Sequence, residues 1–414
     1  MSNSTKIILQ PEYMKKFTCI GSSCKDSCCI GWRVSLDKDT YLKYKRNQDK
    51  ELKPIFKNMV NRNRSGKNDA SYGKIKMDEK GRCPFLNEDN LCKIHSKLGE
   101  KFLSNTCQIY PRFINKVDGM LERSATRSCP EVVRLALLNP NGIIFEQIEE
   151  NEDTTNYVHK IFDTQGHLYL NKPERYFWQI RIFSLSLLQN RNYTLWQRLI
   201  ILGMTYEKIE ELSLNNLTKD IPIMLETMEG VIEDQSMKDG LRNIPNNNQI
   251  QMRLVKELMD KKLIQGVSSE RYLKVVKETL LGIGYVEGAD IREVLKTYEK
   301  NYNEYVLPYI KEKEYILENY LVNEYFMEIM PFGKYKSIWD SYMFLCVIYS
   351  MVKLHMIGVS GHYKELNDDL TLKIIQSFSK AILHNERYIQ GIIKLLKNNG
   401  YDSLAYMAIL VKNN

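Results

Sequence analysis

The sequence predicts a mainly α-helical protein in which a small, irregular, cysteine-rich N-terminal region is followed by a multi-helical domain. Eight of the nine cysteines lie before residue 130. From about residue 141 onward, apolar side chains recur at the three- and four-residue spacing of amphipathic helices. With 43% hydrophobic and 27% charged residues, the 414-residue chain has the composition of a globular protein rather than a disordered one. We therefore divide it into a cysteine-rich metal- or cluster-binding region, 1–140, and a helical domain, 141–414.

The cysteine-rich region has frequent turn signals and few apolar residues for a core. We expect helices over residues 38–57, with Asp37 as the cap, and over 131–138, and two short extended pieces around a polar turn within 83–92. A bound metal would supply the stability that so small a core lacks. Residues 1–134 carry 27 Lys and Arg against 15 Asp and Glu, a net charge of +12, which would attract an acidic partner or simply keep the protein soluble.

The helical domain is predicted from periodicity, helix-capping residues and short polar breaks. One expected helix covers residues 173–188, and another covers 195–203 and is closed by Gly203. A linker is expected at residues 243–248, which contain Pro245 and would divide the domain. The remaining helices are expected at 205–214, 218–234, 249–264, 268–282, 290–304, 311–329, 335–356, 366–383, 385–398 and 401–411.

Two groups of cysteines carry the strongest chemical signal. The first group places four thiols within eleven residues, and the second places three more within a further short segment; their members are Cys19, Cys24, Cys28 and Cys29, then Cys83, Cys92 and Cys107. In a long chain of the reducing cytoplasm, such density favours metal binding over structural disulfides. All-sulfur ligation suits zinc or an iron–sulfur cluster, and the spacing does not choose between them.

Several alternatives stay open at this point. Seven thiols exceed the needs of one four-coordinate centre, so either a second centre exists or some cysteines do not bind metal. Buried free thiols and a redox disulfide are the other interpretations of the clusters. His95 and Cys129 are weaker ligand candidates, and Cys346, within the apolar run at 341–352, is expected to pack as a small apolar residue.

Other classes of protein find little support in the sequence. A phosphate-binding loop is absent, and the glycines between residues 282 and 288 do not follow a predicted strand, as a dinucleotide site requires. No basic stripe with interleaved aromatic residues indicates nucleic-acid binding. The N-terminus lacks the apolar core of a signal peptide, and the run at 341–352 is shorter than the ~20 residues that cross a bilayer. We expect a cytoplasmic protein without a transmembrane segment, and leave peripheral membrane association and oligomerisation open.

The sequence resembles the flagellin lysine-N-methylase family over nearly its whole length. The cysteine-rich part of the resemblance is shared with a broader family of zinc- or iron-chelating cysteine clusters. The matching residues include Pro11, Tyr13, Phe17, Cys19, Gly21, Cys24, Cys28, Cys29, Gly31, Trp32, Cys83, Cys92, Cys107, Tyr110, Pro111 and Arg112, then Arg175, Trp178, Arg191, Arg198, Gly203, Glu318, Tyr320, Glu324 and Pro331.

This resemblance implies a cytoplasmic methyltransferase that moves methyl groups from S-adenosylmethionine to lysine ε-amines of flagellin. It also implies a [4Fe–4S] cluster, with zinc as the alternative. We take Cys19, Cys24, Cys28 and Cys29 as the first ligands and Cys83, Cys92 and Cys107 as additional or competing ones. The catalytic and donor-binding residues stay unassigned. Tyr13, Trp32, Tyr110 and Arg112 lie beside the cysteines and are candidates either to hold the donor or to pack.

A second functional class is a metal-stabilised protein-binding module, with zinc or an iron–sulfur cluster and no catalysis. In that case the basic N-terminal third would engage an acidic protein or RNA, and the helices would support it. The enzyme should bind S-adenosylmethionine and turn over. The binding module should show salt-dependent association alone.

Overall fold

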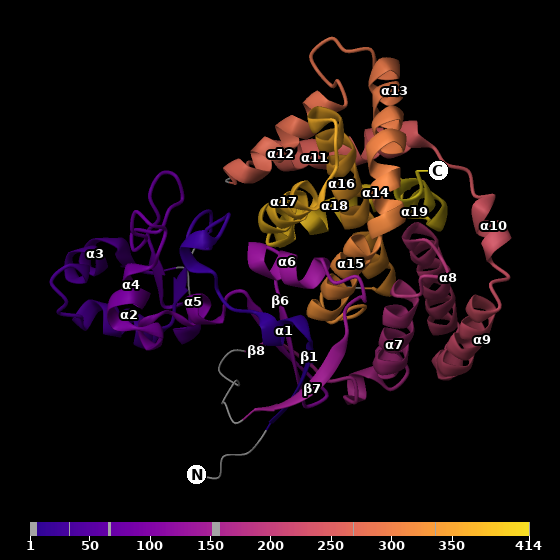
Figure 1. Cartoon of the computed structure of the whole chain (residues 1–414). Coiled ribbons are helices and arrows are strands. Elements are labelled where there is room, and N and C mark those ends of the chain that lie inside the picture. Colours follow the sequence, from indigo (N-terminus) through magenta and orange to yellow (C-terminus); the bar gives the residue numbers. More distant parts are fainter. Residues whose placement is uncertain are drawn as a thin grey trace.

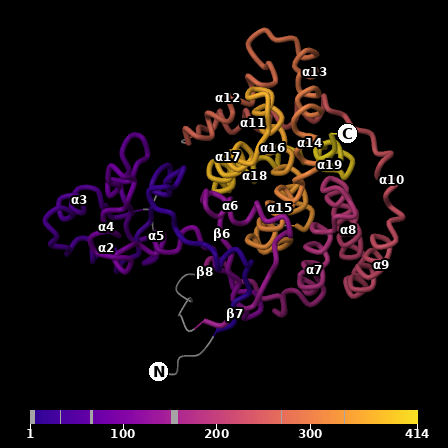
Figure 2. Tube along the Cα trace, in the orientation of Figure 1, coloured from indigo at the N-terminus to yellow at the C-terminus, as the bar shows by residue number. Residues whose placement is uncertain are grey.

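A computed structural model describes residues 6–32, 34–64, 68–150, 158–267, 269–335 and 337–413. Figure 1 shows a small cysteine-rich part on one side, a mixed β-sheet near the N-terminus, and a large helical domain on the other side. The predicted fold class, mainly α with a small irregular cysteine-rich N-terminal region, is confirmed. The Cα trace in Figure 2 shows that α17 (Asp368–Phe378) and α18 (Glu386–Asn398), near the C-terminus, lie on the side of the helical domain that faces the cysteine-rich part.

The cysteine-rich part has its own small core, built on helices and a three-stranded sheet. The predicted helix over 38–57 is instead two helices, α2 (Lys38–Arg46) and α3 (Leu52–Met59). The Asp49 carboxylate accepts a hydrogen bond from the Leu52 amide (2.9 Å) and so starts a new helix after the break. Asp37 caps α2 as predicted, by accepting from the Thr40 amide (2.8 Å). The other elements are β2 (Ser35–Leu36), β3 (Val60–Arg62), β4 (Gly73–Ile75), α4 (Lys93–Leu98) and α5 (Asn105–Ile109).

A five-stranded mixed sheet joins the cysteine-rich part to the helical domain. Its strands, in the order β7-β1-β6-β5-β8, are β7 (Phe145–Glu150), β1 (Lys6–Pro11), β6 (Met120–Ala125), β5 (Arg112–Val117) and β8 (Val158–Phe162). The boundary predicted at residue 140 therefore runs through this sheet. Arg181 of α7 (Phe177–Leu188) donates to both carboxylate oxygens of Glu122 on β6 (2.5 and 2.9 Å), and this buried pair fixes the sheet to the helices.

The helical domain is organised around α16 (Ile338–Tyr363), which is buried from residue 338 to 361. Neighbouring helices enclose it: α8 (Leu195–Leu214), α12 (Glu270–Gly282), α13 (Ile291–Asn301) and α19 (Leu404–Val411). Among the described residues, α16 is the single helix with the length and composition to cross a membrane. All of its apolar stretch is covered by the protein, as in the core helix of a globular domain.

Most predicted helices are confirmed, but several boundaries are wrong. The helix predicted over 335–356 continues to Tyr363 as α16, and the one predicted over 311–329 is divided between α14 (Leu307–Lys313) and α15 (Tyr315–Met327). Gly203 does not close a helix, because α8 continues through it to Leu214. A Cβ at this position would lie 2.4 Å from the ring of Tyr342, so the glycine admits a close helix contact. Residues 243–247 connect two helices that share one core, and residues 268 and 336 of two other predicted helices lie outside the described ranges. The remaining helices are α1 (Tyr13–Lys16), α6 (Pro130–Leu137), α9 (Ile221–Glu233), α10 (Lys238–Arg242) and α11 (Asn248–Ile264).

Candidate functional site

The two predicted cysteine groups lie side by side in the cysteine-rich part. Four of the thiols, Cys19, Cys24, Cys28 and Cys29, are on the loop between α1 and β2, where Cys19 and Cys28 are exposed. Cys83 belongs to the small core, and Cys29, Cys92 and Cys107 pack against it. The Cys83 amide donates to the Cys29 carbonyl (2.9 Å), so the two groups are joined through the backbone. The structure thus brings together segments that are about 60 residues apart in the sequence.

Burial raises the pKa of several of these thiols. Burial raises the pKa of Cys83 to about 12 and that of Cys107 to about 11, and in both cases the charge of Cys92 adds to the increase. The pKa of Cys28 is raised chiefly by a hydrogen bond with Cys29, and the positive charge of Lys380 opposes this increase. A bound metal cation would reverse these shifts, because it stabilises the deprotonated sulfur.

The donor chemistry fits a sulfur-bound metal, but the sulfurs do not form a closed coordination shell. All seven predicted ligands are free thiols in one part of the fold. Within the described ranges, however, no three His, Cys, Asp or Glu side chains are spaced to hold one metal ion. Cys129, the weaker candidate, is buried at the start of α6, and Cys346 is fully buried in α16 as expected of a packing residue.

An ionic contact fixes the loop that carries Cys24 and Cys28 against the helical domain. Lys380 lies 2.9 Å from both carboxylate oxygens of Asp26 and also donates to the Ser27 carbonyl (3.1 Å). The amide of Gln376 donates to Asp26 and to the Ser128 carbonyl, each at 2.8 Å. Because Lys380 and Asp26 are both about six-sevenths buried, water screens this pair little. The contact sets the distance between Cys28 and the helices above it.

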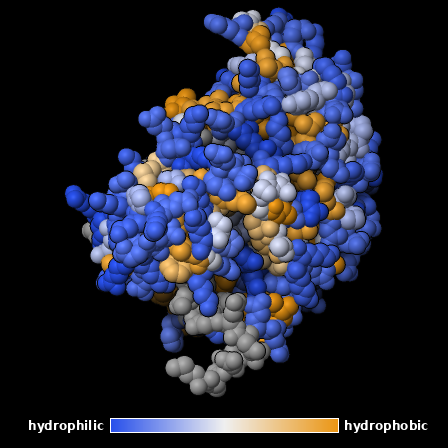
Figure 3. Space-filling view, turned by 60° about the vertical axis from the view of Figure 1, so that its left-hand side comes forward, coloured by the Kyte–Doolittle hydropathy of each residue, from blue (hydrophilic) through white to orange (hydrophobic). Residues whose placement is uncertain are grey.

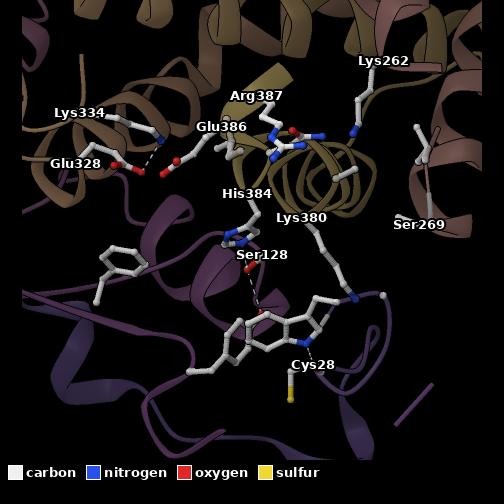
Figure 4. A pocket seen from close by; sticks show the side chains of 18 of the residues that line it. Cys28, Ser128, Lys262, Ser269, Glu328, Lys334, Lys380, His384, Glu386 and Arg387 are labelled. Carbon is white, nitrogen blue, oxygen red and sulfur yellow. Dashed lines mark hydrogen bonds and ion pairs between the residues drawn. The ribbon is translucent and has the colours of Figure 1, made fainter. Parts of the chain in front are cut away.

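A cavity of about 1030 Å³ lies between this loop and the helical domain. Figure 4 shows Cys28 on one side of the cavity and Lys262, Glu386 and Arg387 on the other. Of the four aromatic and basic candidates beside the cysteines, Trp32 and Tyr110 line the cavity, whereas Tyr13 and Arg112 do not. The hydroxyl of Tyr13 instead donates to the buried Asn323 (2.5 Å), and Arg112 lies over the ring of Phe17.

The centre of the cavity holds a short hydrogen-bonded chain. The Ser128 hydroxyl lies 3.1 Å from the hydroxyl of Tyr110 and 3.0 Å from Nε2 of His384. The ring centroids of Trp32 and Tyr110, which both line the cavity, are 5.1 Å apart and the rings are tilted. His384 is open to the cavity yet surrounded by protein. Burial, followed by the charges of Arg127 and Lys334, lowers its pKa to about 4, so the ring is neutral at pH 7.

Positive charge predominates in the cavity lining. Glu328 accepts hydrogen bonds from Lys160 and Lys334, each at 2.8 Å. Burial opposes ionisation of Glu328, but the two lysines outweigh it and lower its pKa to about 2. The cavity therefore contains a permanent ionic triad, together with the further cations Lys262, Lys380 and Arg387.

Sequence reasoning did not identify the residues that the helical domain contributes to this cavity. Lys262, Glu328, Lys334, His384 and Arg387 come from distant segments and share no spacing motif. Only the position of a lone histidine or a charged residue within an otherwise amphipathic helix would have marked them, and that signal is weak.

The face that carries the cysteine-rich part is mostly hydrophilic, with hydrophobic residues in small scattered groups (Figure 3).

Two protein-family models match the segments of the chain that form the two sides of the cavity. Residues 181–410 match the model of the FliB lysine N-methylase C-terminal domain, which is more than half of the chain. The chain belongs to the FliB lysine N-methylase family. Residues 18–130 match a model of zinc- or iron-chelating domains of the CxxCxxCC type. The two matches thus cover the cysteine-rich wall and the helical wall of the cavity.

Curated relatives agree with this assignment. A lysine-N-methylase of Salmonella typhimurium is 28% identical over 261 residues, which is 61% of this chain and 60% of the relative. A lysine-N-methylase of Salmonella choleraesuis matches to the same extent. The flagellar biosynthetic protein FliU of Salmonella muenchen is 35% identical over 137 residues, 33% of this chain and 80% of FliU. The matched part thus spans about 60% of the length of the two methylases. No solved structure matches.

Proposed function

We propose that this FliB-family chain is a cytoplasmic protein-lysine N-methyltransferase that transfers methyl groups from S-adenosylmethionine to lysine ε-amines of flagellin. The names of the relatives, lysine-N-methylase and flagellar biosynthetic protein, support the reaction and the flagellar substrate. The observation that carries the proposal is the cavity itself. Its walls come from both family segments, with Cys28, Trp32 and Tyr110 on one side and Lys262 and His384 on the other.

The environment of the cavity suits an amine nucleophile. In a direct transfer, the lysine nitrogen forms a bond to the methyl carbon while the carbon–sulfur bond of the donor breaks and the sulfur keeps the electron pair. The ammonium must therefore lose its proton first. Burial and neighbouring cations, which keep His384 neutral, also favour the neutral form of an incoming lysine. The aromatic faces of Trp32 and Tyr110 offer a surface for the base or the positive sulfonium of the donor.

We further propose that the cysteine-rich wall holds a [4Fe–4S] cluster, with zinc as the alternative. Its ligands come from Cys19, Cys24, Cys28 and Cys29, with Cys83, Cys92 and Cys107 as additional or competing ones. When bound, such a cluster supplies either structural support, an open iron for the donor, or an electron. Lys380 and Asp26 hold the cysteine loop against the cavity in each of these cases.

The test is a methylation assay with protein purified without oxygen. The chain is incubated with S-adenosylmethionine and unmodified flagellin, and intact mass spectrometry counts the methyl groups added. We expect modified flagellin, about four iron atoms per chain and a brown chromophore. Zinc without colour would overturn the cluster but not the methylase. Salt-dependent binding of flagellin without any methyl transfer would overturn the methylase and favour a metal-stabilised binding module.

A further inference from the structure

Lys262 is a buried cation that reaches the cavity without a carboxylate partner. The residue lies on α11, is only 4% exposed and lines the cavity. Figure 4 shows its amine directed toward the interior of the cavity. Its amine lies 5.6 Å from the centroid of the Tyr388 ring, and no ion pair to Lys262 exists within the described ranges. A buried ammonium without an anion is costly, so this position calls for a negatively charged ligand.

The surroundings of Lys262 add positive charge on the same side. Arg387 lies in the first turn of α18, lines the cavity, and likewise has no ion pair in the part of the chain that the structure describes. The positive end of the α18 dipole lies at the same place. Glu386, the other charged residue of that turn, lies toward Glu328 and Lys334 in Figure 4.

Each of the remaining cations of the cavity has a carboxylate partner. Lys160 and Lys334 share the carboxylate of Glu328, and Lys380 binds that of Asp26. The described cations without a carboxylate partner, Lys262 and Arg387, thus lie across the cavity from Cys28 (Figure 4). The aromatic pair of Trp32 and Tyr110 lies beside Cys28, whose carbonyl accepts a hydrogen bond from the indole of Trp32. A ligand that matches this cavity has an anionic group at one end and a flat, stackable group at the other.

We propose that Lys262 and Arg387 bind the carboxylate of the amino-acid part of the methyl donor, and that its nucleoside end lies toward Trp32 and Tyr110. The inference rests on the proposed function, because the methyl donor is the small molecule of that reaction with a carboxylate at one end and a purine at the other. A carboxylate of an acidic residue beside the acceptor lysine is the other source of the same chemistry, and the test separates the two.

The experiment measures binding of two nucleosides by isothermal titration calorimetry to the full chain. S-adenosylhomocysteine keeps the amino-acid carboxylate, and 5′-methylthioadenosine lacks the amino-acid part. We expect Lys262→Met to lower the affinity for S-adenosylhomocysteine by ~10- to 100-fold, which is the range of a hydrogen bond to a charged group. The affinity for 5′-methylthioadenosine should stay within about twofold of wild type. Lys262→Arg should keep most of the affinity. Lys261→Met, which removes the neighbouring lysine of α11 outside the cavity, should behave as wild type.

Three results would overturn the inference. Lys262→Met could bind S-adenosylhomocysteine as tightly as wild type, which would place the carboxylate elsewhere. The Lys262→Met variant could instead bind both nucleosides normally and raise only the KM for flagellin. That result would show that Lys262 binds an acidic residue beside the acceptor lysine of the substrate. Wild-type protein could also bind the two nucleosides equally. Failure of wild type to bind either nucleoside, or to methylate flagellin, would refute the proposed function itself.

Discussion

Substitution of Glu328 by Gln tests the charge arrangement of the cavity wall. The side chain is 8% exposed, and its two oxygens pair with Lys160 and Lys334. Its pKa is about 2 in the folded protein against an ordinary value of 4.5, a difference of about 2.5 units. At ~1.4 kcal/mol per unit, the charge contributes about 3 kcal/mol to the free energy of unfolding at pH 7. Loss of one partner of a buried pair commonly costs ~3–5 kcal/mol, and Lys160, which is 29% exposed, can regain some hydration.

The sign of the pH dependence follows from the lowered pKa. The stabilisation by the Glu328 charge is fully present above pH 4.5 and is lost as the pH falls from about 4.5 toward 2. In this range Glu328 binds a proton in the unfolded state but stays ionised in the folded state, so protons favour unfolding. Glu328→Gln should therefore be about 3 kcal/mol less stable than wild type at pH 7, and the difference should shrink in acid. Urea unfolding followed by circular dichroism at several pH values measures this. Glu386→Gln, an exposed carboxylate of the same cavity, is the control. Equal stability of Glu328→Gln and wild type at pH 7 would refute the reasoning.

Two further predictions concern the metal and the helix packing. The double substitution Cys28→Ser/Cys29→Ser should remove the bound metal, which elemental analysis and visible absorption measure. Cys346→Ala should keep the metal, because Cys346 is buried in α16 of the helical domain and not in the cysteine-rich part. Retention of metal by the double variant would exclude both thiols as ligands. Gly282→Ala should push α12 away from α16 and lower the free energy of unfolding by more than ~3 kcal/mol, because the added Cβ would lie 1.7 Å from the Gly358 carbonyl oxygen. Gly391→Ala, on an open helix surface, should instead raise the melting temperature slightly, and a comparable loss in both glycine variants would contradict this account.

The sequence predicted the local structure well, because helix periodicity and capping residues are local signals. Asp37 begins α2, and α11 and α18 begin within one residue of the predicted positions. The sequence alone predicts a helix end at Gly203, because glycine commonly ends helices. Only the approach of Tyr342 from another helix explains why it lies inside α8.

Long-range features were not accessible in this way. The five-stranded sheet pairs β1 with β7 and β5 with β8, and such pairings depend on contacts between distant segments. Cysteine density identified the first wall of the cavity, including Cys28. The second wall requires knowledge of which helices meet, since residues such as Lys262 and His384 are unremarkable in the sequence. Tertiary packing, not local propensity, assembles the candidate site.

The most direct test of the central claim is flagellin methylation by a variant whose cavity is filled. Ala381 lines the cavity, and Ala381→Trp would occupy it without removing a charged or sulfur-bearing side chain. Ala289→Trp, an exposed position before α13, is the matched control. Mass spectrometry of flagellin after incubation with S-adenosylmethionine should show methyl groups added by wild type and by Ala289→Trp, and at least ~10-fold fewer added by Ala381→Trp. An unchanged circular dichroism spectrum of Ala381→Trp would show that this variant is folded. Full methylation by folded Ala381→Trp would contradict the account and move the reaction to another part of the protein.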